Sequence, residues 1–294
     1  MLGGVRIGQS YDVKIAPDER SVVTLTNSRV VVWDLESGEV ARSTEFADGA
    51  YVDFAPDGSS IAVVNTSGEC RVLSAADLHE VARLTGEDLR EGPDVLFGPE
   101  GDLLVQASWN GDIVVRSVPE GEIFHREREA GRMIEALAHS PDRSLFAYAS
   151  AVRGEGEVVV RVRRWPLDEN GPEEIVRLTE DRPSIDAIAI DADARLAVRE
   201  RTRLSVFDLA GSRHASRDTQ LSGLEGAVAW SARGDLAATD RGPDGQHAVT
   251  LLTPDLEEQW ATALPYACAI DFSNSGDLLA VGSWEAGTVV RTPT

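Results

Sequence analysis

A short turn motif recurs seven times along this chain at nearly regular intervals. It reads "IAPDER" at 15–20 and, in its last copy, "FSNSGD" at 272–277. The third residue of each copy, called the register residue below, is Pro17, Pro56, Pro99, Pro141, Ala192, Ala232 or Asn274. Successive register residues are 39, 43, 42, 51, 40 and 42 positions apart. A period of this length predicts a repeat architecture, in which each unit buries its apolar surface against its neighbours.

Each unit contains four strand-like segments. In the second unit, "AYVDF" (50–54) precedes the turn and "SIAVV" (60–64) follows it, and two further segments complete the unit. Runs of Val, Ile and Leu between Gly, Pro and Asp turns are typical of β-structure, and no helical period competes with them. Four strands every 40–45 residues are typical of propeller blades. The prediction is therefore an all-β, seven-bladed β-propeller of four-stranded antiparallel blades.

The two ends of the chain complement each other. The last unit has only three strand-like segments, whereas "GGVRIGQ" (3–9) is a spare segment before the first unit. We expect 3–9 to pair with Thr288–Thr292, so that the N-terminal strand completes the last blade and no sheet edge is left open there. On this interpretation residues 1–294 form one propeller domain.

Several units resemble the WD-repeat family. "VVVWDLESGE" (30–39) carries the Trp33-Asp34 dipeptide for which that family is named, and Phe207-Asp208 is a conservative counterpart. "ASWNGDIVVRS" (107–117) and "GSWEAGTVVRT" (282–292) are similar to the family's hairpin between second and third strands. The resemblance covers essentially the whole chain and implies a propeller closed by its N-terminal strand. No Gly-His dipeptide occurs, so the family's Asp-His-Ser-Trp hydrogen-bond network is not expected here.

The only lysine, Lys14, lies inside an apolar segment. In the repeat alignment it shares a column with Asp53 and Asp271, and the other four units have Leu96, Ala138, Ala189 and Ala229 there. Ring closure would place Asp271, Lys14 and Asp53 on three successive innermost strands, where a cation between two anions is tolerated. We expect a structural charge cluster. The alternative is a reactive amine for imine chemistry, but flanking carboxylates would raise the pKa of Lys14 rather than lower it.

Composition limits the classes of partner. The net charge of -22 repels nucleic-acid phosphates and anionic lipid, so neither nucleic acid nor membrane is expected as a partner. No apolar run is long enough to cross a bilayer, and the first residues do not resemble a secretory signal. Cys70 and Cys268 are expected to be free thiols in a reducing compartment. The prediction is a cytoplasmic, acidic, monomeric protein.

Motifs of catalysis are missing from the sequence. The five histidines fall in different units without metal-ligand spacing, and no nucleophile elbow or phosphate-binding glycine loop occurs. We therefore expect no enzyme activity, no metal and no cofactor. One alternative remains open: a propeller hydrolase or lactonase with a site at the mouth of the central channel, for which Lys14, Asp53 and Asp271 are the inner-strand candidates.

The two faces of the predicted ring differ in chemistry. Turns on the bottom face, such as "LESGE" and "TPDLEE", are mostly acidic. Connections on the top face hold aromatic and basic residues that commonly anchor protein interfaces, namely Trp109, Trp284, Tyr266, Arg132, Arg153, Arg199, Arg201 and Arg241. Alternatively, the tryptophans pack locally over the rim and the arginines pair with neighbouring acids.

These features predict a non-enzymatic scaffold that binds a protein partner on its top face near the channel mouth. A third hypothesis is a neutralising partner of a basic protein, bound through the acidic bottom face and strongly salt-dependent.

Overall fold

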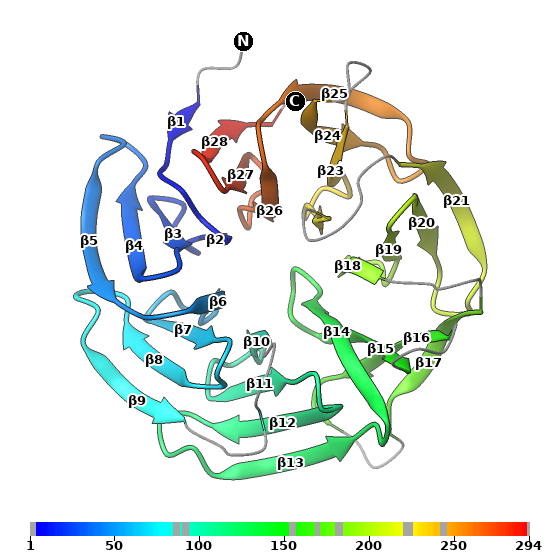
Figure 1. Ribbon diagram of the computed structural model, residues 1–294, viewed down its shortest axis with the longest axis horizontal. Coiled ribbons are helices and arrows are strands. Elements are labelled where there is room, and N and C mark those ends of the chain that lie inside the picture. Colours follow the sequence, from blue (N-terminus) through cyan, green and yellow to red (C-terminus); the bar gives the residue numbers. More distant parts are fainter. Residues whose placement is uncertain are drawn as a thin grey trace.

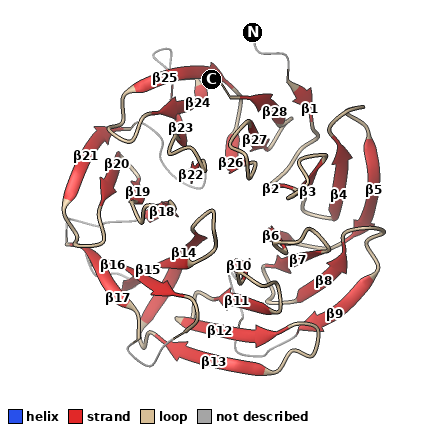
Figure 2. Ribbon diagram, turned by 180° about the vertical axis from the view of Figure 1, so that it is seen from behind, coloured by secondary structure: helices blue, strands red, loops and turns tan. Residues whose placement is uncertain are grey.

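The computed structural model describes residues 4–84, 89, 94–152, 157–167, 171–179, 185–219, 226–241 and 246–292. These residues form 28 strands in seven four-stranded antiparallel sheets, and they contain no helix. The sheets stand as blades around a central axis (Figure 1; Figure 2 shows the same ring from behind). The predicted seven-bladed propeller is confirmed.

The first three blades run outward from the axis. Blade 1 has β2 (Asp12–Ile15), β3 (Ser21–Leu25), β4 (Arg29–Asp34) and β5 (Val40–Glu45). Blade 2 has β6 (Gly49–Phe54), β7 (Ser60–Asn65), β8 (Cys70–Ser74) and β9 (Glu80–Leu84). Blade 3 has β10 (Asp94–Phe97), β11 (Leu103–Ala107), β12 (Asp112–Ser117) and β13 (Ile123–Arg128).

The next three blades repeat this order. Blade 4, the 51-residue unit, has β14 (Arg132–His139), β15 (Leu145–Val152), β16 (Val158–Arg164) and β17 (Glu173–Leu178). Blade 5 has β18 (Ile185–Ile190), β19 (Leu196–Glu200), β20 (Arg203–Phe207) and β21 (Arg213–Asp218). Blade 6 has β22 (Val228–Trp230), β23 (Leu236–Arg241), β24 (His247–Leu252) and β25 (Glu258–Ala263).

Blade 7 joins the two ends of the chain. Its order from the axis is β26 (Ala267–Phe272), β27 (Leu278–Ser283), β28 (Thr288–Arg291) and β1 (Val5–Arg6). Val5 lies opposite Val289, and Arg6 lies opposite Thr288. The N-terminal strand therefore completes the last blade, over a shorter stretch than expected, and pairs the edge of β28.

The core is divided among the interfaces between blades. Seven clusters of buried side chains each join two neighbouring blades, including one that joins blade 7 to blade 1 through Ile7, Val13 and Ala280. This distribution follows from the sequence, because inner strands with apolar residues on both faces need a blade on each side.

The seven repeat turns share one conformation. Two positions after each register residue the backbone has a positive φ between 55° and 85°, at Glu19, Gly58, Gly101, Arg143, Ala194, Gly234 and Gly276. The register residues themselves surround one cavity of about 320 Å³, together with Asp142 and Arg143. The sequence alignment of the units thus corresponds to one ring of equivalent positions at the bottom face.

The Trp33-Asp34 dipeptide of the WD-repeat resemblance forms hydrogen bonds within blade 1. The Trp33 indole nitrogen donates a hydrogen bond to Thr24 Oγ1 at 2.9 Å, so this tryptophan is anchored within blade 1. Asp34 Oδ1 accepts hydrogen bonds from the backbone nitrogen and hydroxyl of Ser37 and holds the following turn. Cys70 and Cys268 are not joined in a disulfide, and burial raises the pKa of the Cys70 thiol to about 12. None of the described residues lies in a helix capable of spanning a membrane.

Candidate functional site in the central channel

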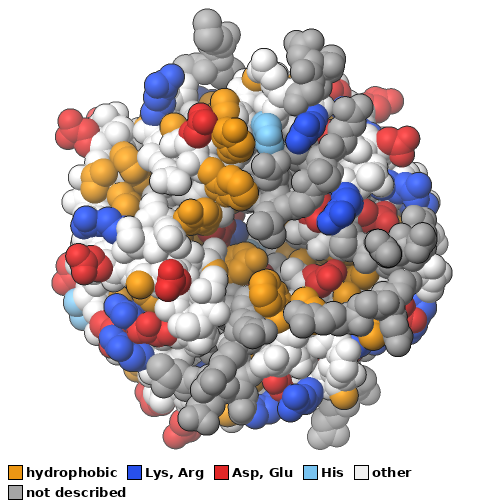
Figure 3. Space-filling view, viewed as in Figure 1, with side chains coloured by type: hydrophobic (Ala, Val, Ile, Leu, Met, Phe, Trp, Pro, Cys, Tyr) orange, Lys and Arg blue, Asp and Glu red, His pale blue; other side chains and the backbone are white. Residues whose placement is uncertain are grey.

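The inner strands of the seven blades surround a cavity of about 770 Å³. This volume is within the range of pockets that hold small-molecule ligands, roughly 300–1,000 Å³. Hydrophobic side chains gather around the central hollow in the space-filling view (Figure 3). The cavity follows directly from the repeat, because alternate residues of every inner strand point toward the axis.

The residues facing the cavity form two levels. The lower level, three positions before the register residue, consists of Lys14, Asp53, Leu96, Ala138, Ala189, Ala229 and Asp271. The upper level, five positions before it, consists of Asp12, Tyr51, Asp94, Ala136, Ala187, Ala227 and Ala269. Blades 7, 1, 2 and 3 therefore supply a polar sector, whereas blades 4, 5 and 6 supply six alanines, called the alanine sector below.

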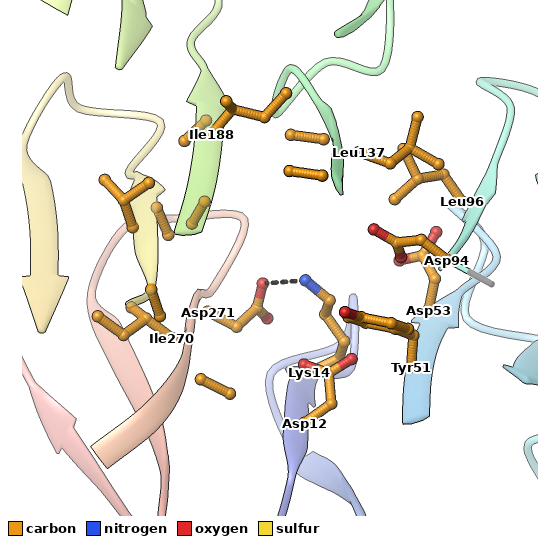
Figure 4. A pocket seen from close by; sticks show the side chains of 18 of the residues that line it. Asp12, Lys14, Tyr51, Asp53, Asp94, Leu96, Leu137, Ile188, Ile270 and Asp271 are labelled. Carbon is orange, nitrogen blue, oxygen red and sulfur yellow. Dashed lines mark hydrogen bonds and ion pairs between the residues drawn. The ribbon is translucent and has the colours of Figure 1, made fainter. Parts of the chain in front are cut away.

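Lys14 forms an ion pair with Asp271. The Lys14 Nζ lies 3.4 Å from Asp271 Oδ1, and Asp271 Oδ2 accepts a hydrogen bond of 2.7 Å from the backbone nitrogen of Ile15 (Figure 4). Burial acts to lower the pKa of Lys14, but Asp271 and then Asp12 outweigh it and raise that pKa above its ordinary range. Lys14 is thus a fixed cation that joins blade 7 to blade 1, and it lacks the lowered pKa of a reactive amine.

Asp53 does not pair with Lys14 as the alignment predicted. Arg143 Nη1 and Nη2 donate to its carboxylate at 2.8 and 3.1 Å, and the backbone nitrogen of Phe97 donates at 2.8 Å. Burial acts to raise the pKa of Asp53, but Arg143 and then His139 hold it well below its usual range. Lys14, Asp53 and Asp271 were expected to form one cluster, but the structure has two separate pairs. Lys14 pairs with Asp271, and a second cation, Arg143, pairs with Asp53.

Arg143 joins three blades at the bottom of the channel. It lies in the repeat turn of blade 4, yet its guanidinium also donates to the carbonyl oxygens of Phe54 at 3.0 Å and Phe97 at 2.9 Å. It lines both the 770 Å³ cavity and the smaller one at the bottom face. Arg143 was not among the residues predicted from the sequence, although an arginine stands where four units have glycine in the turn.

Asp12 and Asp94 have no basic partner among the residues that the structure describes. Asp12 accepts hydrogen bonds from the backbone nitrogens of Val13 and Val52, each 2.9 Å, and Asp94 accepts one of 2.8 Å from Val95. Within the described part of the chain, no basic side chain lies at ion-pairing distance from either carboxylate. Burial raises the pKa of Asp12 to about 6 and that of Asp94 to about 7. The alignment could have found both, since they lie two positions before the column of Lys14.

Replacing Asp94 by asparagine should stabilise the protein at pH 8. Burial raises the pKa of Asp94 from 3.8 to about 7 in the folded protein. Between pH 4 and pH 7 the unfolded chain has already lost this proton while the folded protein still holds it, so the folded state becomes less stable as the pH rises through this range. Asparagine can still accept the Val95 hydrogen bond without a charge. We expect Asp94→Asn to raise the free energy of unfolding by about 1–2 kcal/mol at pH 8 and by little at pH 4, as measured by urea titration. A variant less stable than the parent at pH 8 would contradict this.

Three aromatic residues predicted for the top face lie at or beside the cavity. Trp109 is 44% exposed, and both Trp109 and Trp284 line the cavity. Tyr266 is 42% exposed and stacks on Trp284, with ring centroids 6.3 Å apart and an interplanar angle of 8°. On its other side Tyr266 packs against His247 at 5.2 Å. We call Trp109, Trp284 and Tyr266 the aromatic rim. Trp284 is half-buried, so local packing accounts for part of its surface.

The predicted arginines have different environments. Arg201 is exposed and lines the cavity, and Arg241 is exposed. Arg132 is held by Glu157 Oε1 at 2.7 Å and by Ser150, as the alternative interpretation expects. Arg153 lies outside the described residues. Arg199 was wrongly placed on the surface: it is fully buried, because β19 continues to Glu200 and leaves only 201 and 202 for the turn.

No metal site is evident in the described ranges, where no three His, Cys, Asp or Glu side chains are grouped to hold an ion. The pKa of His139 is lowered by burial and by Arg143, and its ring Nδ1 donates to the Ser140 carbonyl at 2.8 Å. His139 is thus a neutral, hydrogen-bonded residue beside Asp53.

Comparison with known proteins supports the architecture. The structure is similar to a solved chain of hydrazine synthase from Kuenenia stuttgartiensis, with a TM-score of 0.78 and 14% sequence identity, over 97% of this chain and 96% of that one. At this identity the similarity shows a shared fold alone. No family model matches the sequence, and no curated protein matches it significantly.

Proposed function

We propose that this protein is a cytoplasmic, non-enzymatic protein-interaction platform, a divergent relative of the WD-repeat propellers. Its partner docks on the top face over the mouth of the central channel. The observation that carries this proposal is the aromatic rim, in which exposed Trp109 and the stacked pair of Tyr266 and Trp284 stand at or beside one cavity. Tryptophan and tyrosine are enriched among the residues that contribute most to protein interfaces, and exposed apolar side chains that lie together mark interaction sites.

The charged residues near the rim suit the same role. Exposed Arg201 lines the cavity and remains available to a partner, whereas Arg132 is already held by Glu157 and Ser150. We therefore propose Trp109, Trp284, Tyr266 and Arg201 as the anchoring residues. A bottom-face interaction with a basic protein is distinguished by salt, because contacts between exposed charges weaken as ionic strength rises.

Removing both rim tryptophans should abolish partner capture. Trp109→Ala/Trp284→Ala deletes two side chains of the type that contributes about 2 kcal/mol each, so we expect affinity to fall roughly 1,000-fold. The measurement is affinity capture from native cytosol, followed by titration of the captured protein against both forms at 50 and 300 mM salt. Ile123→Ala/Phe124→Ala is the matched control, because Ile123 (49% exposed) and Phe124 (66% exposed) lie on the outer strand β13.

Equal capture by the tryptophan variant would contradict docking at the rim. Steep loss of binding with salt, unchanged in that variant, would instead support the acidic bottom face. Both variants are first matched to the parent in their urea unfolding midpoints, so that a folding defect is not read as lost binding.

A hydrolase with a site in the channel is the second candidate. The pKa of Asp94, raised by burial to about 7, is the observation that favours it, since a general base works best near the operating pH. Hydrolysis of lactone substrates that is lost in Asp94→Asn would support this function over the platform. Such activity unchanged in Asp94→Asn would exclude Asp94 as its base.

A further inference from the structure

We propose that the central cavity binds a small organic ammonium ion, with its charged group between Asp12 and Asp94 and its apolar body against the alanine sector. This inference goes beyond the proposed function, because it concerns the interior of the channel and a free small molecule rather than a protein at the rim. It rests on the two-sided lining of the cavity, on the acids inside it and on the ion pairs that Lys14 and Arg143 already form there.

The cavity exists because one side of the channel is lined by very small side chains. Blades 4, 5 and 6 place six alanines at the two levels where blades 7, 1, 2 and 3 place mostly larger polar residues. Leu137 of blade 4 and Ile188 of blade 5 also line this side (Figure 4). The alanines and these two side chains accept the hydrocarbon part of a ligand and offer it no side-chain hydrogen bond. The acids on this side, Glu135 of blade 4 and Asp186 of blade 5, also line the cavity.

The opposite side carries an excess of negative charge. Asp12, Asp53, Asp94 and Asp271 line it together with two cations, Lys14 and Arg143. Each cation is committed, since Lys14 pairs with Asp271 and Arg143 is held by Asp53 and two carbonyl oxygens. Among the described residues, Asp12 and Asp94 have backbone donors alone. Of these four carboxylates, Asp12 and Asp94 are the two without a cation at ion-pairing distance among the described residues.

Three successive blades bring this pair together with an aromatic ring. Asp12 is on β2, Tyr51 on β6 and Asp94 on β10, all at the upper level. Tyr51 is 38% exposed inside the channel, so its ring and hydroxyl are accessible to a ligand. Carboxylates beside an aromatic ring favour an ammonium group through both ion pairing and cation–π attraction. An anion would meet repulsion from the same carboxylates.

The two carboxylates destabilise the fold when no cation is bound near them. A buried carboxylate without a cation destabilises the fold, and the expected gain on replacing Asp94 by asparagine measures that cost. A bound ammonium ion would supply the missing charge, so the ligand would stabilise the folded protein by mass action.

The test is calorimetric titration of the parent protein at pH 8 with three probes of similar shape: benzylammonium, benzyl alcohol and benzoate. We expect benzylammonium to bind at least tenfold more tightly than benzyl alcohol, and benzoate not to bind. Asp94→Asn should weaken benzylammonium about tenfold, and Asp12→Asn/Asp94→Asn should reduce it to the level of benzyl alcohol. Asp255→Asn removes the same charge from an exposed turn and should change nothing.

Two further measurements separate the two halves of the site. Ala138→Val fills part of the alanine sector and should weaken benzylammonium and benzyl alcohol alike. In the parent, benzylammonium affinity should rise roughly tenfold from pH 6 to pH 8, because binding favours the ionised form of Asp94, which faces Asp12, Lys14, Tyr51 and Asp53. Binding of benzylammonium no tighter than that of benzyl alcohol, or no binding up to millimolar concentration, would overturn the proposal. The tryptophan variant tests the rim separately, so either proposal can fail alone.

Discussion

Arg143→Ala should lower the free energy of unfolding by about 3–5 kcal/mol at pH 7. Asp53 is 1% exposed, and Arg143 is the one basic side chain within 3.5 Å of its carboxylate among the described residues. Alanine leaves that carboxylate buried with the Phe97 backbone donor, and with His139 Nε2 at 3.8 Å. It also frees the carbonyl oxygens of Phe54 and Phe97 from the guanidinium. Urea unfolding followed by far-ultraviolet circular dichroism measures the loss.

The control is Arg20→Ala, because Arg20 is exposed in the equivalent turn of blade 1. We expect this change to alter stability by less than about 0.5 kcal/mol. The pH dependence gives a second check. The pKa of Asp53 is held below its ordinary value, so its ion pair stabilises the fold above about pH 4, and that contribution is lost as the pH falls further. The difference between Arg143→Ala and the parent should therefore shrink in acid. A difference that is the same at pH 3 and pH 7 would contradict the ion pair as its cause.

Lys14→Met should lower stability by about 2–3 kcal/mol at pH 8. Methionine keeps most of the length of the side chain but removes the charge that faces Asp271, and that charge also lowers the pKa of Asp12 and of Asp94. Burial raises the pKa of Asp271, as it does those of Asp12 and Asp94. Without Lys14, the repulsion among the carboxylates of Asp12, Asp94 and Asp271 is no longer balanced by a neighbouring ammonium group. Arg143 is then the one cation on this side of the described cavity lining.

The loss in Lys14→Met should be smaller at pH 5 than at pH 8. The pKa values of Asp12 and Asp94, about 6 and about 7, mean that both are mostly protonated at pH 5, so less negative charge remains to be balanced. Parallel urea titrations at the two pH values test this. Lys14→Arg, which keeps the charge, should recover part of the stability. Full stability of Lys14→Met at both pH values would show that Lys14 does not bridge blades 7 and 1.

The sequence was sufficient to predict the ring and its closure. Seven register residues at intervals near 42 specify how many blades there are, and they occupy equivalent places around one cavity. Lys14 and Asp271 could be placed together because neighbouring blades present the same repeat position side by side. Periodicity is a local property of the chain, and a propeller extends it to all blades through the same interface.

Contacts that skip a blade could not be predicted in this way. Arg143 belongs to blade 4 and binds Asp53 of blade 2, an interaction across the channel that no register column contains. Arg199 shows the same limit at a strand end, where two more paired residues, Arg199 and Glu200, turned an expected loop arginine into a buried one. In both cases the partner of a charge depends on side-chain reach and on where a strand stops pairing.

The sequence by itself determined the fold class, the number of blades, the closing strand and the level of the channel at which Lys14 stands, because each follows from a repeated hydrophobic pattern. Only the tertiary structure decided which carboxylates are paired and which are not. The six alanines of three blades are unremarkable in their own segments, and they form a wall only when the ring brings them opposite Asp12, Tyr51 and Asp94. The acids of the channel then differ in pKa. Asp53 has a cation at bonding distance, whereas Asp94 has none among the described residues.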